Sequence, residues 1–147
     1  MSALRKKCVR THRDPAFVLQ DTPHPSKVEF LNPRLRLIDE VHVDGCIFDE
    51  SEPLRCDYLV NINERNQSIL LELKGSDVLH AIDQLRATTE SLAGDLNSKL
   101  KWIVCYSGNP AFPTSAQAEE LKVRRESRNK IVLYIRPSVH VHEIDRP

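Results

Sequence analysis

The segment from Cys56 to Gly75 reads CDYLVNINERNQSILLELKG and contains two apolar runs separated by a polar stretch. The runs, at residues 58–62 and 69–73, predict the two strands of a β-hairpin. With the turn centred in the polar stretch, residues whose numbers sum to 129 face one another across the hairpin. Asp57 and Glu72 meet this condition. The sequence therefore predicts that their carboxylates are cross-strand neighbours.

Side chains alternate between the two faces of a strand, so Glu72 and Lys74 share one face while Leu71 and Leu73 form an apolar layer on the other. Facing carboxylates repel one another, and a divalent cation such as Mg²⁺ relieves that repulsion. Lys74 beside the cation would stabilise developing charge or help to orient and deprotonate a water molecule. A metal ion and a lysine suit phosphodiester hydrolysis. The alternative is an exposed hairpin edge with ordinary charges.

The composition is typical of a soluble globular protein with one domain. The chain has 147 residues, of which 29% are charged and 40% hydrophobic, and its formal net charge is zero. Nucleic-acid binders are often basic, so the net charge neither supports nor excludes nucleic-acid binding. We find no signal-peptide pattern and no segment that approaches the length of a membrane span. We therefore expect a cytoplasmic protein that does not contact a membrane.

The four cysteines are Cys8, Cys46, Cys56 and Cys105. They include no Cys-x-x-Cys pair, and a zinc site built from Cys8, His12 and two distant cysteines matches no closed structural pattern. We therefore expect buried free thiols in a reducing compartment.

Residues 1–33 are expected to form an irregular N-terminal arm, because four prolines exclude a long helix. The arm starts with basic residues, which would stay in solvent or touch phosphates. Residues 35–136 form the predicted core, an α/β fold with a mixed central β-sheet flanked by helices. Around the hairpin we expect a strand at 35–43, a helix at 77–97 capped by Ser76 or Asp77, a strand at 102–106 beside the hairpin, a helix from Thr114 or Ser115 to about Arg128, a strand at 131–135 and a short edge strand at 139–144.

An aspartate, then Glu-x-Lys one hairpin later, then a helix and a buried strand resembles the PD-(D/E)xK nuclease superfamily. This superfamily includes restriction endonucleases, Holliday-junction resolvases and the nuclease domains of recombination helicases. The resemblance covers residues 35–136 and implies a restriction-endonuclease-like fold. It implies that Asp57 and Glu72 bind Mg²⁺, with Mn²⁺ as a substitute, and that the main-chain carbonyl of Leu73 is a further ligand. Lys74 would act on the attacking water, and the activity would be DNA cleavage in restriction, repair or defence, with RNA as a possible substrate.

Three positions depart from the pattern of the superfamily. Cys56 stands where many members have proline. Many members carry a further glutamate on an N-terminal helix; here the candidates are Glu40 and Glu29, and we prefer Glu40 as a catalytic residue and metal ligand, although it lies in a predicted strand. One branch carries a glutamine on the helix after the motif with a tyrosine one turn later. Gln84 occupies the first of these positions, but Thr88 occupies the second.

Two other groups of residues have both a functional and an ordinary interpretation. His140 and His142 alternate on one strand face, where they could pair at a metal or lie on an exposed edge strand. A basic cluster late in the second predicted helix could contact a DNA backbone or only favour the negative end of that helix. Its members are Lys122, Arg124, Arg125, Arg128 and Lys130.

Two alternatives to a nuclease stay open. The chain could be a catalytically inactive module of nuclease fold that binds nucleic acid or a partner protein. It could also be an unrelated α/β scaffold in which Asp57 and Lys74 form an ion pair. The small size and zero net charge favour a homodimer or a subunit of a larger complex.

Overall fold

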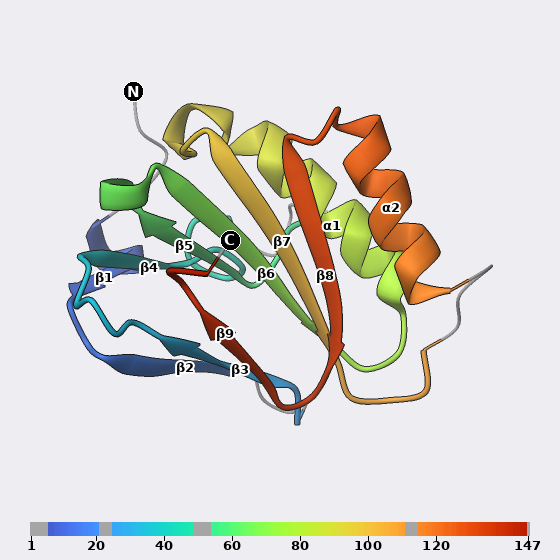
Figure 1. Cartoon of the computed structure of the whole chain (residues 1–147), viewed down its shortest axis with the longest axis horizontal. Coiled ribbons are helices and arrows are strands. Elements are labelled where there is room, and N and C mark those ends of the chain that lie inside the picture. The colour runs from blue at the N-terminus through green and yellow to red at the C-terminus, as the bar shows by residue number, and fades with distance from the viewer. Residues whose placement is uncertain (1–5, 21–24, 49–53, 111–114, 147) are drawn as a thin grey trace.

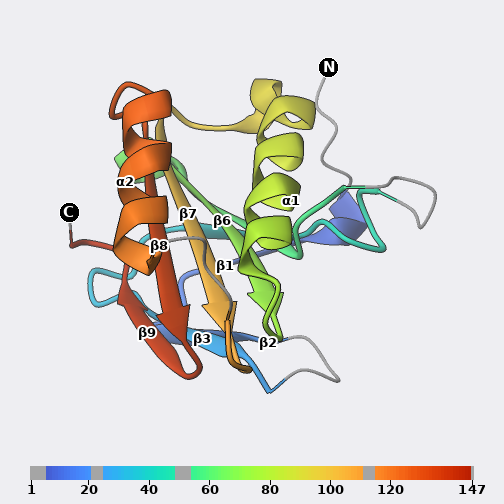
Figure 2. The same ribbon diagram turned by 90° about the vertical axis from the view of Figure 1, so that its right-hand side faces the viewer.

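The computed structural model describes residues 6–20, 25–48, 54–110 and 115–146. These residues form a six-stranded mixed sheet, a three-stranded sheet and two α-helices, α1 (Val78–Ser91) and α2 (Ala116–Glu126). Both helices cover one face of the larger sheet, and the smaller sheet covers the other (Figures 1 and 2). The predicted α/β class and mixed sheet are confirmed. The helices, however, flank one face only.

The six-stranded sheet combines antiparallel and parallel neighbours. Its strand order is β1-β4-β5-β6-β7-β8. Neighbours from β1 to β6 are antiparallel and those from β6 to β8 are parallel, so the predicted position of the strand after α1 beside the hairpin is confirmed. The strands are β1 (Val9–His12), β4 (Ile38–His42), β5 (Tyr58–Ile62), β6 (Gln67–Lys74), β7 (Lys99–Tyr106) and β8 (Ile131–Pro137).

The β5–β6 hairpin has the predicted register. Tyr58 pairs with Leu71 and Ile62 with Gln67, and each pair of numbers sums to 129. The connection is a short 3₁₀ turn that closes at Asn66, whose φ of 52° is left-handed. Asparagine tolerates that conformation better than most residues.

The helices begin where the capping residues predict. The Asp77 carboxylate accepts the main-chain N–H of His80, and the Ser115 hydroxyl accepts that of Ala118, both at 3.1 Å. Thr114, the other candidate cap, lies outside the described residues. The first helix is shorter than predicted because it ends at Ser91, before a separate 3₁₀ turn at Ala93–Asp95.

Two apolar cores lie on opposite faces of the six-stranded sheet. The core under the helices includes Leu85, Trp102 and Leu70. The core between the two sheets includes Phe30 and Leu71. Both faces of β6 are covered, so the face that carries Glu72 is also buried. The sequence predicted an apolar layer on one face of the hairpin, whereas the structure has one on each face.

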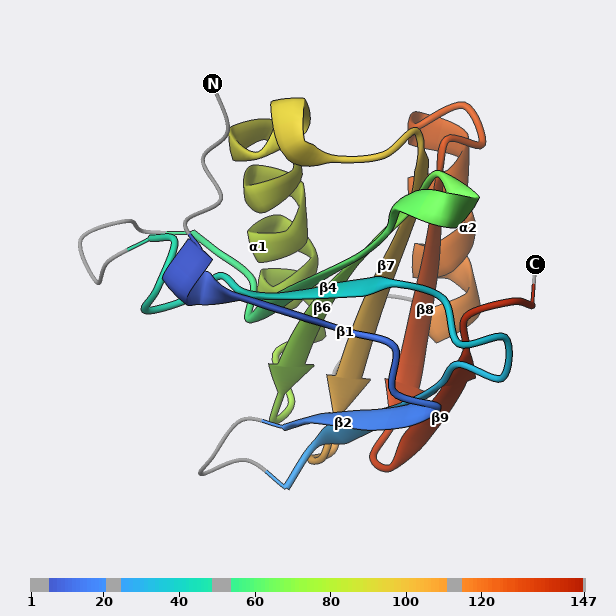
Figure 3. The same ribbon diagram turned by 90° about the vertical axis from the view of Figure 1, so that its left-hand side faces the viewer.

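The expected irregular arm at residues 1–33 is wrong for its described parts. Besides β1, these parts contain β2 (Ala16–Gln20) and β3 (Lys27–Leu31), which pair antiparallel in the second sheet. The expected edge strand near the C-terminus is confirmed as β9 (His140–Glu143), which pairs parallel with β3. Figure 3 shows β1, β2 and β4 on the side of the molecule away from the helices.

Cys8 and Cys46 form a disulfide, which corrects the expectation of four free thiols. The pairing of β1 with β4 brings the segment before β1 against the segment after β4, and the Cα atoms of the two cysteines lie 5.7 Å apart. Cys56 and Cys105 are buried and free, as predicted. Within the described residues, neither helix is long and apolar enough to cross a lipid bilayer.

Candidate functional site

Asp57 lies immediately before β5 and is held by main-chain groups of β6 and of Val43, the residue that follows β4. Its N–H donates to the carbonyl of Leu71 at 3.1 Å, and its own carbonyl accepts the N–H of Val43 at 3.0 Å. Its Oδ2 atom accepts the N–H of Leu73 at 2.8 Å. Asp57 therefore bonds to the residues on either side of Glu72, which places the two acids side by side.

Glu72 is a buried carboxyl group, with only 3% of the residue exposed. Its Oε2 lies 3.5 Å from the Nζ of Lys74, whereas its Oε1 has no hydrogen-bond partner among the described residues. Burial first, and then the negative charge of Asp57, raise the pKa of Glu72 to about 9, although the Lys74 ammonium opposes the shift. The sequence-predicted trio of Asp57, Glu72 and Lys74 is thus brought together.

Helix α1 supports the site from the side opposite Leu71. The Thr88 hydroxyl accepts the N–H of Cys56 and donates to the carbonyl of Gln84, both at 2.8 Å. The Gln84 Nε2 donates to the carbonyl of Arg55 at 2.9 Å, and its Oε1 is buried without a partner among the described residues. The two residues that precede Asp57 are therefore fixed to α1.

The C-terminal end of β6 is fixed by contacts from the residue before β3 and from the segment that follows β7. The carbonyl of Lys74 accepts the Ser26 hydroxyl at 2.9 Å and the Ser107 N–H at 3.0 Å. One residue further, the carbonyl of Gly75 accepts the N–H of Gly108 at 2.7 Å. A Cβ atom at Gly108 would lie 3.2 Å from that carbonyl oxygen, so this close approach favours glycine. These hydrogen bonds fix the main chain of Lys74, from which its side chain extends.

Glu40 does not join this group, which corrects the preferred assignment of a third acid. It pairs with Val60 across β4 and β5, and Val60 belongs to the core between the sheets, on the face opposite Glu72. Its carboxylate bonds instead to Arg10 at 2.6 Å and to the Nε2 of His12 at 2.5 Å.

Glu29, the other candidate for the third acid, also lies elsewhere. It pairs with Val18 and Val141, which are 49% and 50% exposed, so it lies on the outer face of the second sheet. Among the described residues, no three His, Cys, Asp or Glu side chains are arranged to hold a metal ion. A metal at Asp57 and Glu72 would complete its shell with water and main-chain oxygen, as Mg²⁺ commonly does. The carbonyl of Leu73 stays a predicted ligand.

Comparison with protein-family models, curated proteins and solved structures finds no match for this chain.

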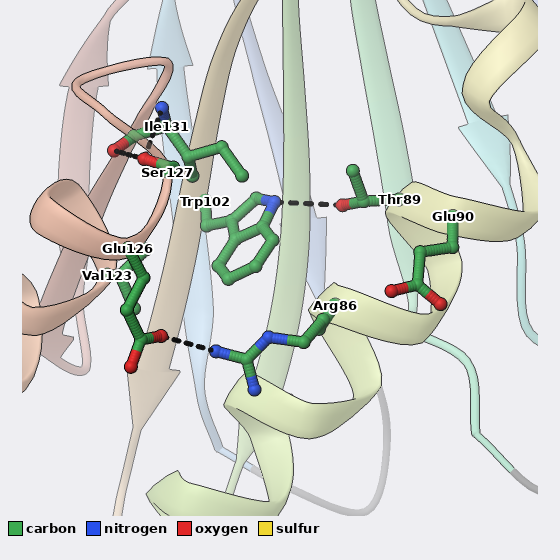
Figure 4. Close-up of a pocket in the computed structure, with 8 residues that line it drawn as sticks. All are labelled: Arg86, Thr89, Glu90, Trp102, Val123, Glu126, Ser127 and Ile131. Carbon is green, nitrogen blue, oxygen red and sulfur yellow. Dashed lines mark hydrogen bonds and ion pairs between the residues drawn. The ribbon is translucent and has the colours of Figure 1, made fainter.

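The sequence does not predict a cavity of about 250 Å³ between α1 and α2. The Trp102 ring lies at its base, where its Nε1 donates to the Thr89 hydroxyl at 3.0 Å (Figure 4). Arg86 of α1 and Glu126 of α2 form an ion pair at 3.4 Å across it. The side chains that form this cavity are spread over four elements, and no local sequence pattern connects them.

The two histidines of β9 are not on an open edge face, which corrects the favoured interpretation of that strand. His140 pairs with Val28 and His142 with Phe30, and both partners lie in the core between the sheets. His142 is 8% exposed. The basic cluster near the end of α2 is exposed, and its two interpretations both stay predictions.

Proposed function

We propose that this protein is a metal-dependent nuclease with a restriction-endonuclease-like fold that hydrolyses phosphodiester bonds of DNA, with RNA as a second possible substrate. In this proposal Asp57 and Glu72 bind Mg²⁺ or Mn²⁺, and Lys74 acts on the attacking water. The observation that most favours it is the Oε1 atom of Glu72, a buried oxygen beside a second carboxylate, with no hydrogen-bond partner in the described part of the chain.

The donor set fits a hard divalent cation. A buried carboxylate oxygen without a partner makes the charged group costly, and such a group usually takes up a proton instead. Lys74 contacts only one oxygen of Glu72. A cation between Asp57 and Glu72 would compensate both charges and provide a partner for Oε1.

The residues around the cation would each have a defined task. A bound Mg²⁺ would lower the pKa of a coordinated water and stabilise charge on the phosphate. The N–H of Leu73 fixes the orientation of the Asp57 carboxylate. Lys74 is partly exposed, with 20% of its side chain accessible, so its ammonium can reach both Glu72 and a substrate phosphate.

The arrangement of elements also supports the proposal. The antiparallel strands β4, β5 and β6 are followed by α1 and by a parallel strand, β7. Asp57 lies at the start of β5, and Glu72 and Lys74 lie at the end of β6. This is the order that the PD-(D/E)xK resemblance implies for the motif.

A catalytically inactive module that binds nucleic acid or a partner protein is the second candidate. The low exposure of Asp57 and Glu72, 6% and 3%, favours it, because a substrate phosphate must reach the metal. Cytoplasmic location and assembly as a homodimer or in a larger complex belong to both proposals.

A cleavage assay with a parallel melting experiment tests the nuclease proposal. Wild type, Lys74→Met and the exposed control Lys99→Met would be incubated with duplex, single-stranded and branched DNA and with RNA, with Mg²⁺, Mn²⁺ or no metal. We expect metal-dependent cleavage by wild type and Lys99→Met, and at least about a hundredfold loss in Lys74→Met.

The two readouts separate the candidates. A metal-dependent rise in Tm without cleavage of any substrate would favour the inactive module. If Mg²⁺ and Mn²⁺ change neither the Tm nor any substrate, the metal site and the nuclease proposal are both wrong.

A further inference from the structure

The two sheets enclose a second cavity where β8 and β9 lie at their edges. Its volume is about 360 Å³, which falls within the range of small-ligand sites. Tyr134 and Arg136 of β8 line one side, and His140 and His142 of β9 line the other. Arg146, beyond β9, also contributes to the wall.

Each of the two histidines of β9 holds one ring nitrogen away from solvent. The Nε2 atoms of His140 and His142 are both inaccessible and have no hydrogen-bond partner among the described residues. The ring centroids are 6.0 Å apart, and the His142 ring meets the Tyr134 ring edge-on at 5.8 Å. Unpaired buried nitrogen atoms are rare in proteins because each costs desolvation energy, so a ligand in the cavity would relieve a real deficit.

The charges around the histidines identify the kind of ligand. Burial, and then the positive charges of Lys101, His140 and Arg136, lower the pKa of His142 to about 4. Burial and Arg136 also lower the pKa of His140. The polar and charged groups that line the cavity are Tyr134 and Arg136 from β8, His140, His142 and Glu143 from β9, and Arg146 after it. Lys101 of β7 does not line the cavity, but its charge acts on His142.

Positive groups predominate on this wall. Glu143 pairs with Arg146 at 3.2 Å, and Arg136 pairs with Glu120 of α2 at 3.2 Å while lying over the Tyr134 ring. Lys101 contacts only a main-chain oxygen in this area, the carbonyl of Arg146, at 3.0 Å. A metal cation would be repelled by the charges that already disfavour protonated histidine. An anion would be attracted by the same charges.

We propose that this cavity binds an oxyanion of the phosphate class, held by His140, His142 and Arg136. A neutral imidazole offers one N–H donor, and a guanidinium offers several in a planar array that matches phosphate oxygens. The site is separate from Asp57 and Glu72, because Tyr134 lies in register with Ile103 and Leu71, on the opposite face of the larger sheet. The proposal does not depend on the nuclease assignment. Inorganic phosphate and a phosphodiester of a nucleic-acid strand share this chemistry.

A titration followed by ¹H–¹⁵N NMR of the histidine rings tests the proposal. Inorganic phosphate would be added to wild type, Arg136→Gln, His140→Gln and the exposed control Arg34→Gln, at constant ionic strength kept with chloride. We expect saturable shifts of the His140 and His142 ring nitrogens, with affinity reduced about tenfold in Arg136→Gln and unchanged in Arg34→Gln. The pKa of His142 should rise when phosphate is bound, because an anion favours imidazolium.

A second titration with a short oligonucleotide that lacks terminal phosphates identifies the source of the anion. Shifts of the same ring nitrogens by both probes would assign a phosphodiester, and shifts by inorganic phosphate alone would assign a small free anion. The proposal is overturned if neither probe shifts the histidines, if Arg34→Gln and Arg136→Gln weaken binding equally, or if Zn²⁺ shifts both rings while phosphate shifts neither. His140→Gln and Arg136→Gln alter partly exposed residues, so the test does not depend on replacing buried His142.

Discussion

The Oδ2 atom of Asp57 accepts the main-chain N–H of Leu73 at 2.8 Å, one residue beyond Glu72. This bond stabilises the charged form of Asp57 and leaves the neighbouring Glu72 with the cost of a second buried negative charge. Glu72 therefore holds a proton at neutral pH in the metal-free protein.

Glu72 should make the metal-free protein less stable as the pH rises. Folding raises the pKa of Glu72 from 4.5 to about 9, so between these values the folded state keeps a proton that the unfolded state releases. The free energy of unfolding should therefore fall across this window. Glu72→Gln should flatten the decline and raise the Tm at pH 8.5 by roughly 3 °C or more. Urea unfolding at pH 5, 7 and 9 measures the slope. Glu90→Gln, which changes an exposed glutamate of α1, should behave as wild type.

The affinity for metal should increase as the pH rises, whereas the stability of the metal-free protein should decrease. A cation at Asp57 and Glu72 must displace the proton of Glu72, so the rise in Tm caused by Mn²⁺ should be larger at pH 8.5 than at pH 6. Glu72→Gln and Asp57→Asn should each remove most of this rise. Differential scanning fluorimetry with and without Mn²⁺ measures it. An equal rise at both pH values would show that Mn²⁺ binds elsewhere.

Thr88 should be required for the stability of the site although it is not an acid or a base. Thr88→Val keeps the shape of the side chain but leaves the buried N–H of Cys56 without its acceptor. We expect a loss of about 1–3 kcal/mol in the free energy of unfolding. Thr88→Ser keeps the hydroxyl and is the matched control. Chemical denaturation compares the two, and equal losses in both variants would show that the hydrogen bond from Cys56 to the Thr88 hydroxyl is not the cause of the loss.

Counting free thiols in solution tests for the disulfide. The unfolded, unreduced protein should expose two thiols to a thiol reagent, from Cys56 and Cys105, and four after reduction. The folded protein should react slowly, because burial raises the pKa of both free thiols. Four thiols without reduction would restore the expectation of a fully reduced protein.

Loss of the disulfide should also lower stability. The bond links residues 38 positions apart, and closing a loop of that size contributes about 3–4 kcal/mol through the unfolded state. The double variant with Cys8→Ser and Cys46→Ser should have a Tm several degrees lower than that of wild type. A double variant with the Tm of wild type would mean that the two cysteines are not bonded in solution.

The hairpin was predictable because its register depends only on local residues. The turn at Asn63–Asn66 is short, so its position fixes every pair from Tyr58–Leu71 inward. The face that carries Glu40 depends instead on how β4 meets β5 across a long connection, for which the sequence offers no comparable rule. The sequence alone therefore could not predict whether Glu40 lies on the same face of the sheet as Glu72.

The first strand of the second sheet has the alternating pattern of a half-buried strand, but the prolines nearby led to the prediction of an irregular arm. Residues 16–20 alternate exposed and buried side chains, with Phe17 and Leu19 inside. Pro15 stands just before β2 and Pro33 lies beyond β3, so both prolines flank the strands and do not interrupt them. The disulfide had no such signal, because the distance between Cys8 and Cys46 depends on the pairing of β1 with β4.

The parallel pairing of β3 with β9 joins distant parts of the chain, and the Ser138 hydroxyl donates to the carbonyl of Pro25 from 113 positions away. During synthesis on the ribosome, the β5–β6 hairpin can form as soon as its own residues emerge. The smaller sheet is complete only after β9 has been made, so β3 stays without its parallel neighbour until then. The apolar side chains of Val28 and Phe30 therefore lack part of their final core for as long as β9 is missing, and we expect them to be a site where the growing chain can aggregate.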